Sequence, residues 1–191
     1  MELRLSAAMA DTAGLSDERA LVERAKRDRE AFAELYRRHY RAIARYIHRR
    51  VGDPHTTEDL VADSFMLAMT ALPRFRNHGV PVRAWLYRIA SNRVNRWARQ
   101  ARRQATQRLD AERADPKAAP MDARMTREFA RAALLTLPPK YQTVLALHYL
   151  EGMPVAEVAL ATGCRVGTVK SRLARGRDAL RRRLQQRRSQ L

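Results

Sequence analysis

The sequence has few of the residues that build metal, redox or membrane sites. It contains one cysteine, Cys164, so it can form neither an intramolecular disulfide nor a cysteine-rich zinc site. The histidines are scattered rather than paired at metal-ligand spacing. No apolar run approaches the length of a membrane span, and the first ten residues lack the apolar core of a secretory signal. We therefore expect no bound metal, no membrane contact and a cytoplasmic location.

The motifs of common enzymes are also absent from the sequence. There is no glycine-rich phosphate loop, no HExxH pair and no serine nucleophile elbow. Adjacent acids such as Glu58 and Asp59 fit the first turn of a helix better than a general acid and base. We therefore expect that the chain is not an enzyme and has no cofactor and no small-molecule substrate.

Positive charge is abundant and unevenly placed. Lys and Arg number 38 against 20 Asp and Glu, which gives a formal net charge of +18. Every charged side chain between Asp63 and Asp110 is an arginine, and the charged side chains of residues 165–191 are basic except for Asp178. Two separate basic segments predict two contacts with a polyanion, and nucleic acid is the usual partner of so basic a chain. Arginine far outnumbers lysine, which suits bidentate phosphate and guanine contacts but is equally expected of a GC-rich genome.

Apolar residues recur at helical spacing through most of the chain, and no alternating strand pattern is present. The expected fold is all-α, with two small helical domains joined by a flexible linker. One predicted helix starts at Thr56 and Thr57, whose hydroxyls can cap it. The alanine-rich and proline-containing stretch around Pro116 and Pro120 predicts the linker. The expected divisions are a tail at 1–14, a first domain at 15–103, a linker at 104–124, a second domain at 125–185 and a basic tail at 186–191.

The segment 152–177 predicts a helix-turn-helix. A short helix ends at Gly163, which can adopt the left-handed conformation that such a turn needs. The longer helix that follows has an apolar stripe formed by Val166, Val169, Leu173, Leu180 and Leu184. Its polar and basic residues would enter a DNA groove: Arg165, Thr168, Lys170, Ser171, Arg172 and Arg175. The alternative is a solvated basic helix packed on two shorter ones.

A second candidate DNA-binding helix is predicted from Val82 to about Arg103. Its polar face contains arginine and asparagine without any acid, and these residues suit phosphate and base contacts. An ordinary solvated face would mix acids with bases. The residues of this face are Arg88, Asn92, Asn95, Arg96, Arg99 and Arg103.

Short stretches across both predicted domains resemble one family. They are REAFAELY (29–36), EDLV (58–61), VRAWLYRIASNR (82–93) and LPP (137–139) followed by VGTVKSRL (166–173). Together they resemble the extracytoplasmic-function (ECF) sigma factors of the sigma-70 superfamily. The resemblance implies sigma domain 2 and sigma domain 4, which bind core RNA polymerase and direct it to the −10 and −35 promoter elements.

The resemblance also assigns roles to residues. The segment that docks on core polymerase is implied to contain Glu58, Asp59, Leu60, Val61 and Asp63. The chain departs from the family pattern in this segment at Ala62, Leu67 and Met69. Arg76, Asn77 and His78 correspond to the loop that captures a flipped −10 base, and the polar face of 82–103 to further −10 contacts. The basic residues of the helix-turn-helix correspond to −35 contacts.

The implied partners are core RNA polymerase and promoter DNA. An anti-sigma factor is a further implied partner, because members of this family are commonly held by one. The alternative function is a stand-alone helix-turn-helix regulator whose first domain senses a ligand or dimerises. A sensor domain would offer a pocket, whereas the first half of this sequence offers a docking helix and an acid-free helix.

Overall fold

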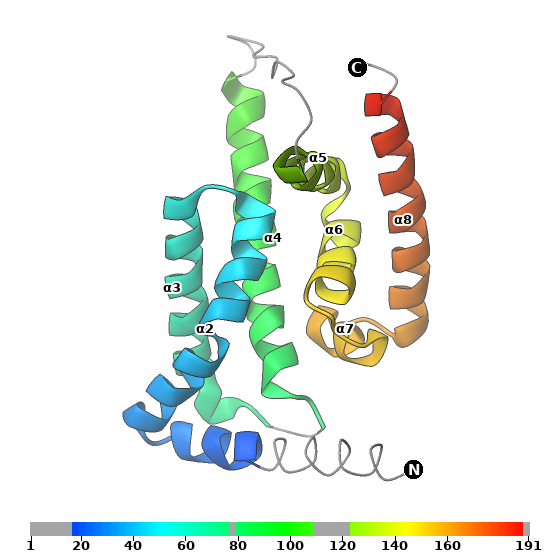
Figure 1. Cartoon of the computed structure of the whole chain (residues 1–191). Coiled ribbons are helices and arrows are strands. Elements are labelled where there is room, and N and C mark those ends of the chain that lie inside the picture. Colours follow the sequence, from blue (N-terminus) through cyan, green and yellow to red (C-terminus); the bar gives the residue numbers. More distant parts are fainter. Residues whose placement is uncertain (1–16, 77–78, 109–122, 189–191) are drawn as a thin grey trace.

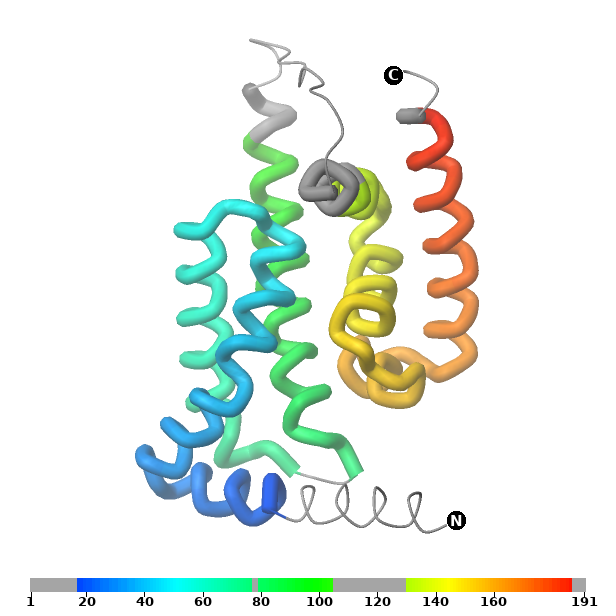
Figure 2. The backbone as a smooth tube through the Cα atoms, in the orientation of Figure 1, coloured from blue at the N-terminus to red at the C-terminus, as the bar shows by residue number. Residues whose placement is uncertain are grey.

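The computed structural model describes residues 17–76, 79–108 and 123–188 (Figure 1). Regular structure within these ranges is helical, which confirms the predicted all-α class. Helical residues 17–25 with α2, α3 and α4 form what we call the N-terminal bundle, and α5 to α8 form the C-terminal bundle. The two bundles lie side by side, with α4 and α2 facing the C-terminal bundle (Figure 2).

The N-terminal bundle consists of three long helices packed against one another. They are α2 (Arg29–Val51), α3 (Pro54–Ala71) and α4 (Val82–Arg108). The Asp28 carboxylate caps α2 by accepting a hydrogen bond from the backbone N–H of Glu30 at 2.9 Å, and α2 ends at Gly52. The buried side chains between the helices include Leu35, Ile43, Tyr46, Ile47, Leu60, Phe65, Leu86, Ala90 and Val94.

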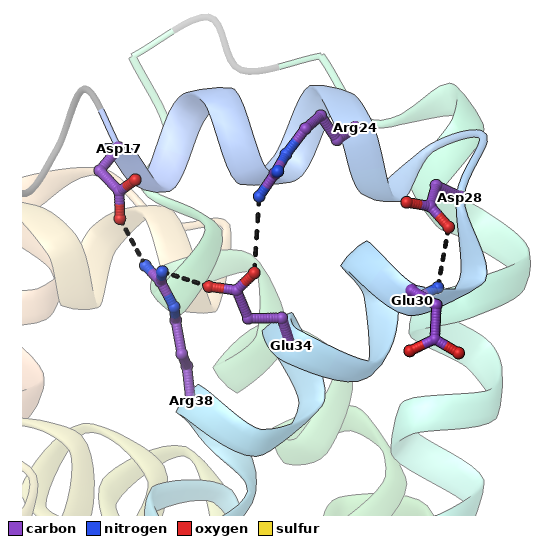
Figure 3. A network of polar contacts seen from close by, with 6 residues as sticks. All are labelled: Asp17, Arg24, Asp28, Glu30, Glu34 and Arg38. Carbon is purple, nitrogen blue, oxygen red and sulfur yellow. Dashed lines mark hydrogen bonds and ion pairs between the residues drawn. The ribbon is translucent and has the colours of Figure 1, made fainter.

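Residues 17–25 pack across the start of α2 through Leu21 and Val22, which are fully buried. A polar network borders this contact (Figure 3): Arg38 of α2 binds Asp17 at 2.8 Å and also Glu34, which in turn contacts Arg24. Exposed ion pairs contribute little stability each, whereas a buried leucine or valine contributes about 1.5–3 kcal/mol. The apolar contact therefore holds this segment in place, and the ion pairs orient it.

The start of α3 differs from the prediction. The helix begins at Pro54, and its cap is Asp53, whose carboxylate accepts a hydrogen bond from the backbone N–H of Thr56 at 2.7 Å. The Thr57 hydroxyl instead donates to the carbonyl of Asp53 at 2.6 Å. Proline fits the first helical position because its missing N–H would have no partner there. Thr56 and Thr57 therefore lie inside the helix rather than before it.

The ends of the long helices also differ from the expected divisions. Helix α4 continues to Arg108, so residues 104–108 of the expected linker are helical, and 109–122 lie outside the described residues. Helix α8 (Val166–Arg188) extends into the stretch expected as the basic tail. The expected N-terminal tail lies outside the described residues. Arginine favours helix formation, which is consistent with the extension of both arginine-rich helices.

The C-terminal bundle places three short helical segments against α8. They are α5 (Ala123–Thr136), α6 (Pro139–Leu145) and α7 (Val155–Thr162). Helix α6 passes between the N-terminal bundle and α8, and α7 crosses its lower end (Figure 1). Helices α6 and α8 approach closely at Gly176, where an added Cβ would lie 3.1 Å from a methyl carbon of Leu145.

Helix α6 runs directly into η2 (Ala146–Leu150), a single π-helical turn. The backbone N–H of Glu151 closes this turn by donating to the carbonyl of Ala146 at 3.0 Å. A π turn contains an extra residue, and one residue corresponds to about 100° of rotation in a regular α-helix. The π turn therefore changes the direction in which the following side chain, that of Glu151, leaves the backbone.

Candidate nucleic-acid interface

The predicted helix-turn-helix is formed by α7, Gly163 and α8. Gly163 ends α7 with φ 64°, and its N–H bonds the carbonyls of Ala159 and Leu160. Val169 and Leu173 of α8 are buried against α7, as the apolar stripe predicted. Val166 was expected in the same stripe but is 44% exposed. It is the first residue of α8, and the buried part of the stripe begins one turn later.

The predicted DNA-contacting residues of α8 do not all have the same environment. Arg165, Lys170, Ser171 and Arg175 are exposed, whereas Thr168 is half-buried. Arg172 is also half-buried, and its Nη1 lies 2.9 Å from Sγ of Cys164 in the turn. The exposed surface of α8 is therefore basic, while Arg172 is held against the turn within the motif.

Helix α4 presents the second predicted surface. Arg88, Asn92, Arg96 and Arg99 are exposed, and their spacings of four, four and three residues place them on one helical face. Asn95 is half-buried, and its Oδ1 accepts a hydrogen bond from Nη2 of Arg50 at 2.8 Å. The structure thus brings four of the predicted residues together and directs Asn95 toward the contact between the two bundles, where its amide lies near Thr143 of α6.

The loop before α4 is only partly described. Arg76 is exposed, while Asn77 and His78 lie outside the described residues. The ring of Phe75 lies 4.6 Å from that of Trp85, measured between centroids, so the residues on both sides of the loop are anchored to each other.

Helix α3, where the resemblance implies a docking site, has exposed acids in its second turn, not in the first turn as the sequence predicted, and a buried apolar side. Glu58 and Asp59 are exposed, whereas Leu60 and Val61 are buried in the bundle core. Asp63 forms an ion pair with Arg93 of α4. Leu60 and Val61 therefore pack within the N-terminal bundle, whereas the Asp63 side chain remains 46% exposed beside Arg93.

The same helix carries an exposed apolar patch that the sequence reasoning missed. Met66, Leu67 and Met69 are 64%, 46% and 48% exposed. The sequence does contain the signal, because a run of apolar residues around a helix cannot all face one core. Contiguous exposed apolar side chains commonly mark a contact with another protein.

The contact between the two bundles was also missed by sequence reasoning. Arg45, Arg49 and Tyr87 of the N-terminal bundle all bind the carboxylate of Glu151. Burial and the neighbouring carboxylate raise the pKa of the Tyr87 phenol above its ordinary value, so the hydroxyl stays protonated and donates. Each of the three residues lies more than 60 positions from Glu151 in the sequence, and single-sequence patterns do not reveal such pairs.

Other chemistry finds little support in the described part of the chain. Its histidine, cysteine and acidic side chains form no group that could hold a metal ion. Its helices include none with both the length and the apolar character needed to cross a membrane.

Comparisons with known proteins agree with this arrangement. A family described as Sigma-70 region 2 matches residues 35–104, and one described as Sigma-70, region 4 matches residues 130–180. The ECF RNA polymerase sigma factor SigW of Bacillus subtilis is 31% identical over 174 residues, which cover 83% of this chain and 91% of SigW. BldN of Streptomyces coelicolor, also an ECF RNA polymerase sigma factor, is 33% identical over 88% of this chain and 65% of its own length.

A solved structure of CnrH in complex with the cytosolic domain of CnrY is also similar. It matches with a TM-score of 0.65 and 29% identity, over 88% of this chain and 97% of CnrH. Sigma factors are not a class of enzyme. The two family matches and the relatives at about 30% identity show that the chain belongs to the ECF sigma factors of the sigma-70 family.

Proposed function

We propose that the chain binds core RNA polymerase and directs it to promoters through a −10 and a −35 element. The observation that carries the proposal is the pair of basic faces on separate bundles, one on α4 and one on α8. The α4 face exposes no acid, and the α8 face exposes a single acid, Asp178, among its basic residues, so each face attracts the DNA backbone. Two faces on two bundles suit two separated promoter elements.

The −35 element is read by the start of α8 in this proposal. A recognition helix lies in the major groove with its N-terminal residues at base edges, while the preceding helix crosses the backbone. Lys170 and Arg175 are exposed and can bind phosphate or guanine. Arg165 and Ser171 add exposed donors, and Arg172 orients the turn through Cys164.

The −10 element is read by the exposed face of α4. Arg88, Arg96 and Arg99 supply charge, and Asn92 supplies an amide that can pair with a base edge. The predicted base-capturing residues Asn77 and His78 lie five and four positions before the first residue of this helix, Val82. Stacking and hydrogen bonding at such a loop hold a base that has left the duplex.

Core polymerase is bound by α3 in this proposal. Glu58 and Asp59 supply exposed negative charge, and Met66, Leu67 and Met69 supply the adjacent apolar contact. Interfaces combine an apolar centre with a polar rim, and this surface has both. Leu60 and Val61 support the helix from within the bundle rather than touch the polymerase, and the partly exposed Asp63 joins α3 to α4 through Arg93.

The proposal includes a cytoplasmic location and no catalytic activity of the chain itself, because the chemistry of initiation belongs to the polymerase. An anti-sigma partner stays a prediction. A relative, CnrH, was solved bound to the cytosolic domain of CnrY, which is the kind of complex that such a partner would form.

Co-purification with core polymerase, followed by sequencing of the transcripts that the reconstituted complex initiates on genomic DNA, tests the proposal. We expect stoichiometric binding and transcripts whose start sites share two upstream motifs. Core polymerase alone is the control. Tight binding to a DNA operator without any association with core polymerase would instead support the stand-alone regulator.

A further inference from the structure

Acidic side chains are rare in residues 130–188 of the C-terminal bundle, and two of the three face the N-terminal bundle. Residues 130–188 contain the acids Glu151, Glu157 and Asp178. Glu151 and Glu157 pair with arginines of the N-terminal bundle, and Asp178 is exposed on α8. Because both bundles are strongly basic, their mutual approach is repulsive except where these two acids lie.

Glu151 makes the most extensive of these contacts. Its side chain is 0% exposed, its Oε1 lies 2.8 Å from Nη1 of Arg49, and its Oε2 lies 3.1 Å from Nη2 of Arg45. The Tyr87 hydroxyl donates to the same Oε2 at 2.9 Å. We call these four residues the Glu151 cluster. Charge-assisted bonds of this kind are about twice as strong as neutral ones, and burial strengthens them further.

Weaker contacts extend the same interface in two directions. On one side, Glu157 of α7 accepts two hydrogen bonds from Arg83 of α4, the shorter at 2.6 Å. On the other side, the guanidinium of Arg131 in α5 donates to the carbonyl of Arg49 at 3.1 Å. Arg49 also donates to the carbonyl of Leu150 at 3.0 Å. The Glu151 cluster therefore lies between two outer contacts.

We call the packing of the two bundles against each other the closed arrangement. One buried charge opposes it. Arg50 is 3% exposed at the same interface, and its guanidinium bonds the neutral oxygens of Tyr46, Thr143 and Asn95. Its Nε has no hydrogen-bond partner. A buried cation without a carboxylate is costly, and separation of the bundles would return it to water. The closed arrangement therefore contains a cost that the Glu151 cluster offsets.

Closure is incompatible with reading two promoter elements together. Elements centred at −35 and −10 are about 25 base pairs apart, or roughly 85 Å at about 3.4 Å per base pair. In the closed arrangement α7 of the helix-turn-helix packs directly on α4. The turn at Gly163 also lies beside Arg88, one of the candidate −10 residues.

We propose that the Glu151 cluster holds the free protein closed and that it must break before both promoter elements can be bound. The second half of this statement rests on the proposed function, and the first half does not. If only open molecules can bind both promoter elements, the measured affinity is the affinity of the open form multiplied by the fraction of molecules that are open. The cluster therefore sets how much of the free protein is ready to act.

The single cysteine provides a test without engineered labels. Cys164 lies in a pocket between the bundles, together with Val80 and Trp85 of the N-terminal bundle. Cys164 is half-buried in the closed arrangement, and opening exposes its thiol further to Ellman's reagent, so a faster modification reports a larger open fraction. For the full-length E151Q variant we expect a rate about tenfold higher, because loss of the charge weakens three charge-assisted bonds. Small-angle scattering should show a larger radius of gyration for the same variant.

The matched control is Asp178→Asn, which makes the same change in charge on the same bundle away from the interface. Its thiol rate and radius should equal those of the unmodified protein. Equal values for E151Q would overturn the proposal. If E151Q no longer unfolds cooperatively, Y87F takes its place, because Y87F removes one hydrogen-bond donor to Glu151 and keeps the aromatic ring. An unchanged rate of thiol modification in Y87F would then overturn the proposal.

A second readout separates this proposal from the proposed function. In run-off transcription with core polymerase, E151Q should reach half-maximal activity at a lower concentration than the unmodified protein. The closure measurements contain no polymerase. If the unmodified protein does not support transcription, the proposed function is contradicted and the closure result stands. If E151Q shows faster thiol modification but the same half-maximal concentration, the link between opening and activity is refuted.

Discussion

Nη1 of Arg172 lies 2.9 Å from Sγ of Cys164, so an arginine of α8 is tied to the turn that precedes the helix. Three residues further along, Arg175 is exposed. The two arginines look equivalent in the sequence, since both fall outside the apolar stripe. In the structure one supports the shape of the helix-turn-helix, and the other is available to DNA.

This difference predicts separable effects of two alanine substitutions. Arg175→Ala should weaken binding of the reconstituted polymerase to −35-containing DNA by about 1–3 kcal/mol if the arginine reads a base. It should leave thermal stability unchanged, because the side chain is exposed. Arg172→Ala should lower the melting temperature as well as the affinity, since it removes the contact with Cys164. Equal melting temperatures for the two variants would contradict the supporting role of Arg172.

The exposed face of α4 predicts a specific salt dependence. Each phosphate contact releases counterions, so the loss of one contact lowers the slope of log affinity against log salt by about 1. Arg96→Gln and Arg99→Gln should each show this reduction in the reconstituted polymerase bound to promoter DNA. Arg27→Gln removes the same charge from an exposed position before α2 and should leave the slope unchanged. An identical slope in all three variants would exclude α4 from phosphate contact.

Docking on core polymerase is predicted to depend on the exposed side of α3. Met66→Gln should weaken association with core polymerase, while stability should change by less than about 0.5 kcal/mol because Met66 is exposed. Asp63→Ala should act differently, since it removes the ion pair with Arg93 that joins α3 to α4. We expect it to lower the unfolding midpoint in urea. Pull-down with core polymerase and urea titration of each variant separate the two roles, and normal association of Met66→Gln would exclude this surface.

The close approach of α6 and α8 predicts opposite effects of one substitution at two glycines. An added Cβ at Gly176 would lie 3.1 Å from Cδ1 of Leu145 and 3.3 Å from Cβ of Tyr141, whereas one at Gly167 meets open space. Gly176→Ala should lower the free energy of unfolding by about 1–3 kcal/mol through overpacking. Gly167→Ala should raise it by up to about 1 kcal/mol, because alanine favours helix more than glycine does. Stabilisation by both substitutions would show that the two helices can move apart at no cost.

The sequence predicted the helices and the main polar faces because these depend on neighbouring residues. Helical spacing placed Val169 and Leu173 in the core, and Gly163 marked the turn. It could not predict contacts between distant segments. Glu151 resembles any acid that follows a helix, and only the folded chain brings Arg45 and Arg49 to it.

The same limit explains the residues whose environments were not foreseen. Asn95 fits the polar face of α4 by spacing, yet its amide bonds Arg50, which approaches from α2. Leu60 and Val61 were implied as docking residues because they belong to a short motif. Their burial depends on how α3 packs, which a motif does not specify. Resemblance therefore predicts a role for the segment, and the structure separates its exposed residues from its buried ones.

Asp53 provides a pH-dependent test of how α3 begins. Hydrogen bonds from Thr56 hold the pKa of the Asp53 carboxyl below its ordinary value. A group with a depressed pKa in the folded state stabilises the fold above its unfolded pKa, near 4, and this stabilisation is lost as the pH falls through the lower folded value. Asparagine caps a helix about as well but does not titrate. Urea titrations give the difference in free energy of unfolding between the unmodified protein and Asp53→Asn. This difference should be constant above about pH 5 and should fall below about pH 4. Asp53→Ala, which has no capping group, should be less stable than both at neutral pH. A difference between the unmodified protein and Asp53→Asn that does not change with pH would show that the carboxylate of Asp53 does not cap α3.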